Sequence, residues 1–108
     1  MKTRRITKVI PLEDYTLILL FDSGELRLLD MNPYIHSEGI WGRLKDWEVF
    51  SKVRTQEGFG GLVWTNDLDY CPDSAFISSK PLPLDLYKSL MDVYSKRKRT
   101  EKKYKAAG

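Results

Sequence analysis

One histidine and one cysteine restrict the catalytic chemistry available to this chain of 108 residues. A histidine-dependent hydrolase needs its histidine beside a nucleophile and an orienting carboxylate in space. The serine and glutamate that follow His36 are neighbours in sequence only, so we expect an ordinary surface histidine. Cys71 has no basic residue beside it that would activate it as a nucleophile. One cysteine also cannot form a disulfide within the chain, and one cysteine with one histidine cannot complete a zinc site.

Two further segments contain residue types of known ligand sites without the complete motif. Asp67, Asp69 and Asp73 have a spacing similar to the start of a calcium loop, but the glycine and terminal glutamate of an EF-hand are absent. We expect Asp69 and Asp73 to cap turns and a helix around Pro72. Residues 58–61 (Gly-Phe-Gly-Gly) lack the lysine of a phosphate loop, so we expect a hairpin connection. The sequence therefore predicts no catalytic residue, no metal site, no cofactor and no small-molecule substrate.

Aromatic residues outside the predicted strands are the candidates for partner binding. Phe59 is flanked by glycines, which favours an exposed ring that could anchor a protein partner. Tyr34 and Trp41 fall in a segment of irregular pattern and offer part of another such surface. The alternative is that the tryptophans belong to the core, because each buries a large area. The candidate partner-binding residues are therefore Tyr34, Trp41 and Phe59.

Charge is distributed unevenly along the chain. The formal net charge of +3 combines +4 in residues 1–8, −7 in residues 9–95 and +6 in residues 96–108. The domain itself is therefore acidic, and only the C-terminal segment favours nucleic-acid binding. The candidate nucleic-acid-binding residues there are Lys96, Arg97, Lys98, Arg99, Lys102, Lys103 and Lys105. The alternative is a solvated terminus, and any affinity should be for the phosphate backbone because nothing resembles a base-reading element.

The elements that must position these residues begin with an antiparallel meander. Three segments show either alternation of apolar and polar residues or a continuous apolar run, with turn residues between them: 5–10, 15–21 and 25–30. The strand at 15–21 is apolar on both faces, so we expect a central strand that is covered on both sides. Gly24 supplies the left-handed conformation that a short hairpin needs. The fold class predicted is α+β: this small antiparallel sheet, one or two further strands, short helices and a C-terminal helix.

The remaining elements are shorter until the end of the chain. Helical turns are expected near 43–50 and 74–77, and further strands at 52–56 and 62–65. From Pro83 to about residue 103 the period is helical, with an apolar stripe at Leu84, Tyr87, Leu90, Met91 and Tyr94. That stripe needs a surface, either its own sheet or another subunit. We divide the chain into an α+β domain at 1–80 and an amphipathic helix with a basic tail at 81–108.

The sequence also leads to an expectation about the cellular location of the protein. No apolar run exceeds five residues, far short of the roughly 20 that a membrane-spanning helix needs. No charged-then-apolar leader with a cleavage site opens the chain. We therefore expect a cytoplasmic protein without a membrane partner.

The body of the chain also resembles a known family. The residues that carry the resemblance are Leu-Glu-Asp-Tyr-Thr-Leu-Ile-Leu-Leu-Phe at 12–21, Ser-Gly-Glu at 23–25, Asp30, Leu-Lys-Asp-Trp-Glu-Val-Phe at 44–50, Val63-Trp64, Asp-Leu-Asp at 67–69 and Pro72-Asp73. In this order they are similar to the small bacterial family called domain of unknown function 2442. The resemblance covers about residues 5–77, departs from the family at the glycine-rich loop and Cys71, and leaves out the C-terminal helix.

The resemblance implies binding and regulation. It implies a compact α+β domain with no catalytic residues to transfer. Members of the family often lie beside another small domain in apparent toxin–antitoxin pairs, and some are fused to a helix-turn-helix. We therefore expect a non-enzymatic regulatory module, the antitoxin-like partner in a small bacterial protein pair, whose own partner is a toxin-like protein or a second copy. The alternative is a nucleic-acid-binding protein that acts through its basic C-terminal helix.

Overall fold

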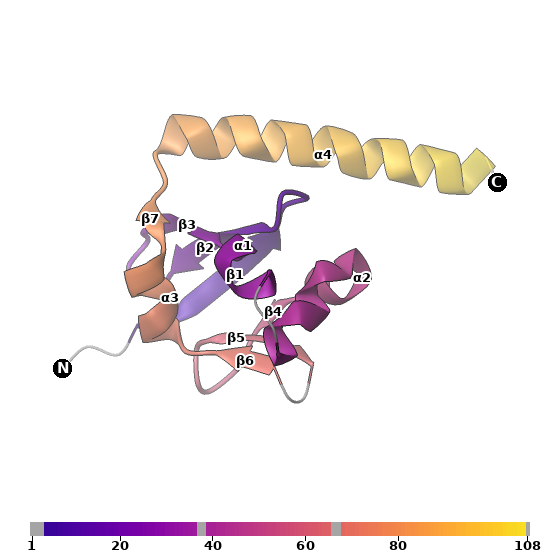
Figure 1. Cartoon of the computed structure of the whole chain (residues 1–108). Coiled ribbons are helices and arrows are strands. Elements are labelled where there is room, and N and C mark those ends of the chain that lie inside the picture. The colour runs from indigo at the N-terminus through magenta and orange to yellow at the C-terminus, as the bar shows by residue number, and fades with distance from the viewer. Residues whose placement is uncertain (1–3, 37–38, 66–67, 108) are drawn as a thin grey trace.

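The computed structural model describes residues 4–36, 39–65 and 68–107, with side chains as far as Lys96. Two antiparallel sheets and short helices form the body, and one long helix follows (Figure 1). The strands are β1 (Ile6–Pro11), β2 (Thr16–Phe21), β3 (Leu26–Asp30), β4 (Arg54–Thr55), β5 (Leu62–Thr65), β6 (Leu68–Tyr70) and β7 (Lys80–Pro81). The helices are α1 (Asn32–Ile35), the 3-10 helix η1 (Ile40–Lys45), α2 (Trp47–Phe50), α3 (Pro72–Ser78) and α4 (Leu84–Ala107).

The α+β class and the N-terminal meander are confirmed. The first sheet has the order β1-β2-β3-β7, so β2 is central, and Leu19 lies opposite Val9 of β1 and Arg27 of β3. Gly24 has a φ of 89° in the turn between β2 and β3, which is the left-handed conformation that the sequence predicts. Leu19 is fully buried on the face of β2 that lies toward the core.

The strand predicted at 62–65 exists, but it does not extend the meander. β5 lies between β4 and β6 in a second sheet. The fourth strand of the first sheet is β7, whose Lys80 and Pro81 pair with Leu28 and Arg27 of β3. A proline is accommodated there because β7 is an edge strand. Alternation along a segment predicts a strand but does not determine which sheet it joins.

The main core lies between the two sheets and the short helices. Its buried side chains come from the inner face of the meander, from α2 and from β5, and include Leu17, Phe21, Phe50 and Leu62. Helical structure is confirmed near 43–50, where α2 begins after Asp46, whose carboxylate accepts a hydrogen bond from the Glu48 backbone N–H at 3.1 Å. The core therefore draws on elements from β1 to α3.

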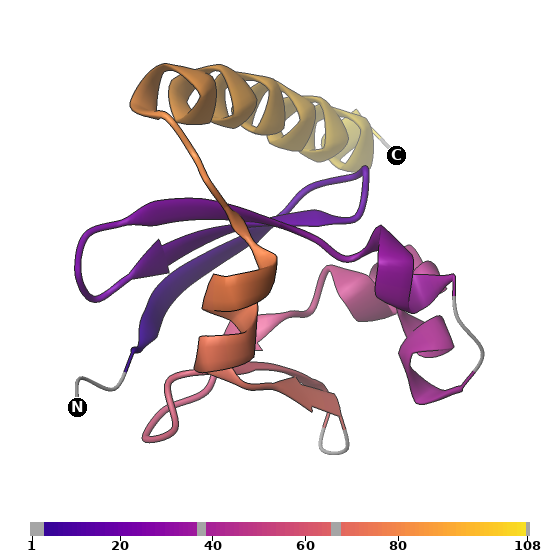
Figure 2. The ribbon, with the colours of Figure 1, turned by 60° about the vertical axis from the view of Figure 1, so that its left-hand side comes forward.

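α4 lies across the opposite face of the first sheet (Figure 2). Ile18 alternates with the core-facing residues of β2, yet it is only 2% exposed. Residues 87, 90, 91 and 94 of α4 are half-buried, and their spacing places them on one helical face. The sheet is therefore covered on both sides, as the sequence of β2 predicts, and the apolar stripe of α4 packs on its own chain.

The segment that leads into α4 contains residues 80 and 81, and the domain boundary predicted from sequence falls between them. β7 spans positions 80 and 81 and pairs with β3, and the Leu82 N–H donates to the Leu26 carbonyl oxygen at 2.9 Å. The helix continues to Ala107, about one turn beyond the end expected. Within the described part of the chain, no helix is long and apolar enough to cross a membrane.

Candidate protein-binding surface

The connection between β4 and β5 presents Phe59 to solvent. Gly58 and Gly60, on either side of it, have φ values of 82° and 81°, a region that glycine enters without steric cost. The Gly60 N–H donates to the Gln56 carbonyl oxygen at 2.8 Å, and the Gln56 N–H donates to the Gly61 carbonyl oxygen at 2.9 Å. These bonds close a compact turn, and the ring of Phe59 at its tip is 59% exposed.

β1 and the residue before it hold this loop in place. Arg5 Nη2 donates to the Gly58 carbonyl oxygen at 2.7 Å, and the Ile6 N–H donates to the Gly60 carbonyl oxygen at 2.8 Å. Gly60 packs so closely on Arg5 that a Cβ at position 60 would lie 2.8 Å from Arg5 Cγ. The loop is therefore fixed before binding, which reduces the entropy cost of ordering Phe59 in an interface.

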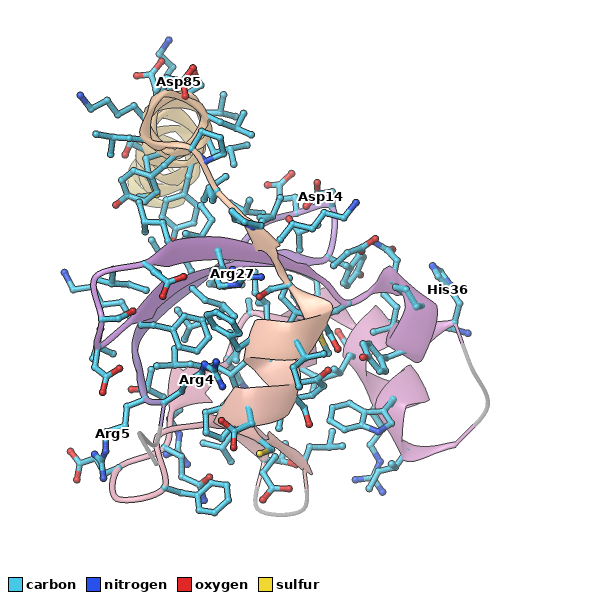
Figure 3. All side chains as sticks on the ribbon, turned by 90° about the vertical axis from the view of Figure 1, so that its left-hand side faces the viewer. Arg4, Arg5, Asp14, Arg27, His36 and Asp85 are labelled. Atoms are coloured by element: carbon cyan, nitrogen blue, oxygen red, sulfur yellow. The ribbon has the colours of Figure 1, made fainter. Side chains whose placement is uncertain are left out.

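Polar groups adjoin this apolar tip. Glu57 in the loop and Arg5 against it are both exposed. Figure 3 shows Arg4 and Arg5 at the same end of the molecule, with Arg5 beside the loop. An exposed aromatic ring with a polar rim is the arrangement found at the centre of many protein interfaces.

Tyr34 and Trp41 have a different environment from Phe59. Both are half-buried, and their rings contact each other with centroids 6.1 Å apart. Trp41 also packs edge-on against Trp64 and Tyr70, with centroids at 5.9 and 5.8 Å. Trp64 is buried, so this cluster continues into the core. The structure therefore brings Tyr34 and Trp41 together.

The hydroxyl groups of this aromatic cluster are paired. The Tyr34 and Tyr70 hydroxyl oxygens lie 2.8 Å apart, and Ser78 Oγ lies 3.4 Å from each of them. Burial, more than any other cause, raises the pKa of Tyr70 to about 12, so its hydroxyl stays protonated at neutral pH. His36, which follows α1, lies on the opposite side of the molecule from Arg5, which marks the Phe59 loop (Figure 3). The aromatic cluster and Phe59 are therefore separate surfaces.

The basic tail lies far from the N-terminal arginines. The N- and C-terminal ends are at opposite sides of the molecule in Figure 1. Lys96 pairs with Asp92 one helical turn earlier at 3.1 Å, and both side chains are exposed. The other six cations of the tail, at 97–99, 102, 103 and 105, lie on α4 beyond the described side chains. The two basic segments therefore do not form one positive face.

The residues first considered for catalysis or metal binding are dispersed. His36 and Cys71 are both exposed, and Cys71 lies at the N-cap position of α3 without a side-chain capping bond. Asp73 lies in the first turn of α3 and not at the N-cap position, which Cys71 occupies, so the predicted helix cap at Asp73 is wrong. Asp67 is outside the described residues. Among the described side chains, no group of three or more His, Cys, Asp or Glu is arranged to hold a metal ion.

Comparison with models of known protein families shows to which family the chain is related. The model of a family described as "Protein of unknown function (DUF2442)" matches residues 6–74. The chain belongs to this family. The matched DUF2442 part runs from β1 into α3 and contains the Phe59 loop and the aromatic cluster, whereas β7 and α4 lie outside it. No curated protein and no solved structure matches the chain.

One set of contacts in the DUF2442 domain was not predicted from sequence. The guanidinium carbons of Arg4 and Arg27 each lie 4.0 Å from the ring centroid of Phe76 in α3. Arg27 also donates from Nε and Nη2 to Ser79 Oγ and to the Ser79 carbonyl oxygen, both at 2.7 Å. These contacts fix α3 to β3 and to the segment that carries Arg5. The available signal was Arg27 itself, a charged residue on the core-facing side of an apolar strand.

Proposed function

We propose that this DUF2442 chain is a non-enzymatic protein-binding module, the antitoxin-like regulatory member of a small bacterial protein pair in the cytoplasm. The observation that carries the proposal is the rigid presentation of Phe59. A large apolar side chain that is 59% exposed has no role in the core of its own chain. Its loop is nevertheless held by four hydrogen bonds, donated by Arg5, Ile6, Gln56 and Gly60.

The chemistry of the surface defines the partner. Burying the exposed part of a phenylalanine ring in an apolar pocket contributes on the order of 1.5–3 kcal/mol, the range of an interface hot spot. Arg5, which contacts the backbone of the loop at Gly58, favours acidic groups at the rim of that pocket. The partner proposed is therefore a protein with an apolar pocket and an acidic edge.

Site-specific photocrosslinking in the native host tests this proposal. The photoreactive residue p-benzoylphenylalanine replaces Phe59 in one strain and Ile77 in a matched control strain. Ile77 is 78% exposed on α3 and is therefore more accessible than Phe59, without belonging to the loop. We expect one discrete light-dependent adduct from position 59 that position 77 does not give. Identical adducts from both positions, or none from position 59, would contradict the proposal.

The antitoxin-like role makes a separate prediction about growth. Expression of the captured partner alone should arrest growth, and co-expression of the wild-type chain should restore it. Phe59→Ala should fail to restore growth, whereas Ile77→Ala should restore it fully. Growth that is unaffected by the partner alone would remove the toxin-like role and leave only a binding module.

A second candidate function is favoured by one observation about the tail. The seven cations between positions 96 and 105 all lie on one continuous helix, α4, which extends to Ala107. A helix with this charge can follow a phosphate backbone without reading bases. If about four to six phosphates are neutralised, log affinity should fall against log salt with a slope of roughly −3.5 to −5.5 on duplex DNA.

Fluorescence anisotropy with labelled DNA and RNA measures this slope. The full chain is compared at several salt concentrations with a chain that ends at Ser95, which lacks the seven cations. We expect affinity of the full chain to be micromolar or weaker at physiological salt and independent of sequence. Equal binding by both chains, or no binding at low salt, would exclude the tail as a nucleic-acid-binding element.

A further inference from the structure

Arg4 is next to Arg5 in the chain but contacts a different element. Its guanidinium carbon lies 4.0 Å from the ring centroid of Phe76 in α3, and its Nη1 lies 3.6 Å from the carboxylate of Asp73 on the same helix. Figure 3 shows Arg4 beside α3 and Arg5 beside the Phe59 loop. The two adjacent arginines therefore connect α3 with the loop.

The ring of Phe76 is a fixed support for the guanidinium of Arg4. It is half-buried and packs edge-on against the buried ring of Phe21, with centroids 5.3 Å apart. Arg27, which is bonded to Ser79, also lies 4.0 Å from its centroid. A cation over the face of an aromatic ring is attracted by the negative charge of that face. Arg4 is therefore attracted to a ring that its neighbours hold in place.

We propose that Arg4 is a positioning residue for Phe59. By anchoring the segment before β1 to α3, it keeps Arg5 Nη2 on the Gly58 carbonyl oxygen, 2.7 Å away, and so keeps the ring of Phe59 in its binding position. This inference rests on the proposed function, in which Phe59 contacts the partner. Residues 4 and 5 are exposed and irregular, and such segments open locally at little cost in free energy. One contact outside the loop therefore changes the fraction of molecules in which the loop is held, and the apparent affinity follows that fraction.

Amide hydrogen exchange on the purified full chain measures the order of the loop without any partner. The Ile6 N–H donates to the Gly60 carbonyl oxygen, and the Gly60 N–H donates to the Gln56 carbonyl oxygen, so these two amides report on the loop. Leu17 is fully buried in β2, and its amide reports on the body. In Arg4→Ala we expect both loop amides to exchange about threefold faster or more, as the loss of a cation–ring contact predicts, and the Leu17 amide to be unchanged.

Two further variants separate the contact from its charge. Arg4→Lys keeps a cation near the ring and near Asp73, so both loop amides should exchange within about twofold of the wild-type rate. Lys8→Ala removes an exposed cation from the adjacent strand β1 and should leave both amides unchanged. Unchanged exchange of the loop amides in Arg4→Ala would overturn the positioning role. Equal acceleration of the Leu17 amide would also overturn it, because Arg4 would then support the whole body.

A double-mutant cycle with the partner captured at position 59 shows how Arg4 acts on binding. Arg4→Ala should weaken the affinity of the wild type about twofold to fivefold, and should change nothing in a Phe59→Ala background, because Arg4 acts through Phe59. No loss in the wild type would overturn the positioning role, and so would an equal loss in both backgrounds, which would indicate direct contact of Arg4 with the partner. Equal affinities of the wild type and Phe59→Ala would instead contradict the proposed function, and hydrogen exchange would still decide whether Arg4 orders the loop.

Discussion

Replacing Leu19 with alanine should lower the free energy of unfolding by about 2–5 kcal/mol, the cost of lost apolar burial and of the remaining cavity. Leu19 is fully buried at the centre of β2, with Val9 and Arg27 opposite it on the neighbouring strands. The loss is large for a domain whose total stability is about 5–15 kcal/mol. Urea titration of both proteins measures the difference.

A leucine on the surface of the protein is the control for this change. Leu84 is 58% exposed at the start of α4, so Leu84→Ala should cost less than about 1 kcal/mol. A cost for Leu19→Ala as small as that for Leu84→Ala would place Leu19 outside the core and contradict the assigned central strand.

Removal of α4 by ending the chain at Pro83 should lower the melting temperature by about 10 °C or more. Without the helix, Ile18 and the surrounding apolar face of the first sheet become exposed to water. Each apolar side chain that loses full burial costs about 1.5–3 kcal/mol, and each kilocalorie corresponds to about 4–8 °C in a domain of this size. Thermal unfolding followed by circular dichroism gives the shift.

A chain that ends at Ser95 is the matched control for this truncation. It keeps the half-buried residues Tyr87, Met91 and Tyr94 and loses the basic tail. Its melting temperature should stay close to that of the full chain. If the chain ending at Pro83 were as stable as the one ending at Ser95, α4 would contribute nothing to the cover of the sheet.

The strands that sequence predicts best are those with long, unambiguous patterns. Thr16–Phe21 contains five consecutive apolar residues, and this indicates a strand covered on both faces. β6 was missed because it has only three residues, it follows turn-forming residues, and its middle residue is the charged Asp69. β7 was missed because a proline counts against a strand, although an edge position accepts it. Strands of two or three residues are defined by their pairing partners, which one segment's sequence does not reveal.

The candidate surface shows the same division between local and long-range information. Flanking glycines predict the exposure of Phe59, because the conformation they permit is a local property. The hydrogen bond from Arg5 to Gly58 joins residues 53 positions apart, and no local pattern predicts it. The packing of Tyr34 against Tyr70, 36 positions away, is equally non-local. Sequence therefore indicates which residues are candidates, and the fold determines which of them share a surface.

The most direct test of the proposed function is the affinity of the captured partner for three purified chains. Calorimetric titration compares the wild type with Phe59→Ala and with Ile77→Ala, after thermal unfolding has shown that all three are equally stable. Phe59→Ala should weaken binding by about 30-fold, as expected for the loss of an interface hot spot, and Ile77→Ala by less than about threefold. Equal affinities for the wild type and Phe59→Ala would contradict the assignment of the Phe59 loop as the protein-binding surface.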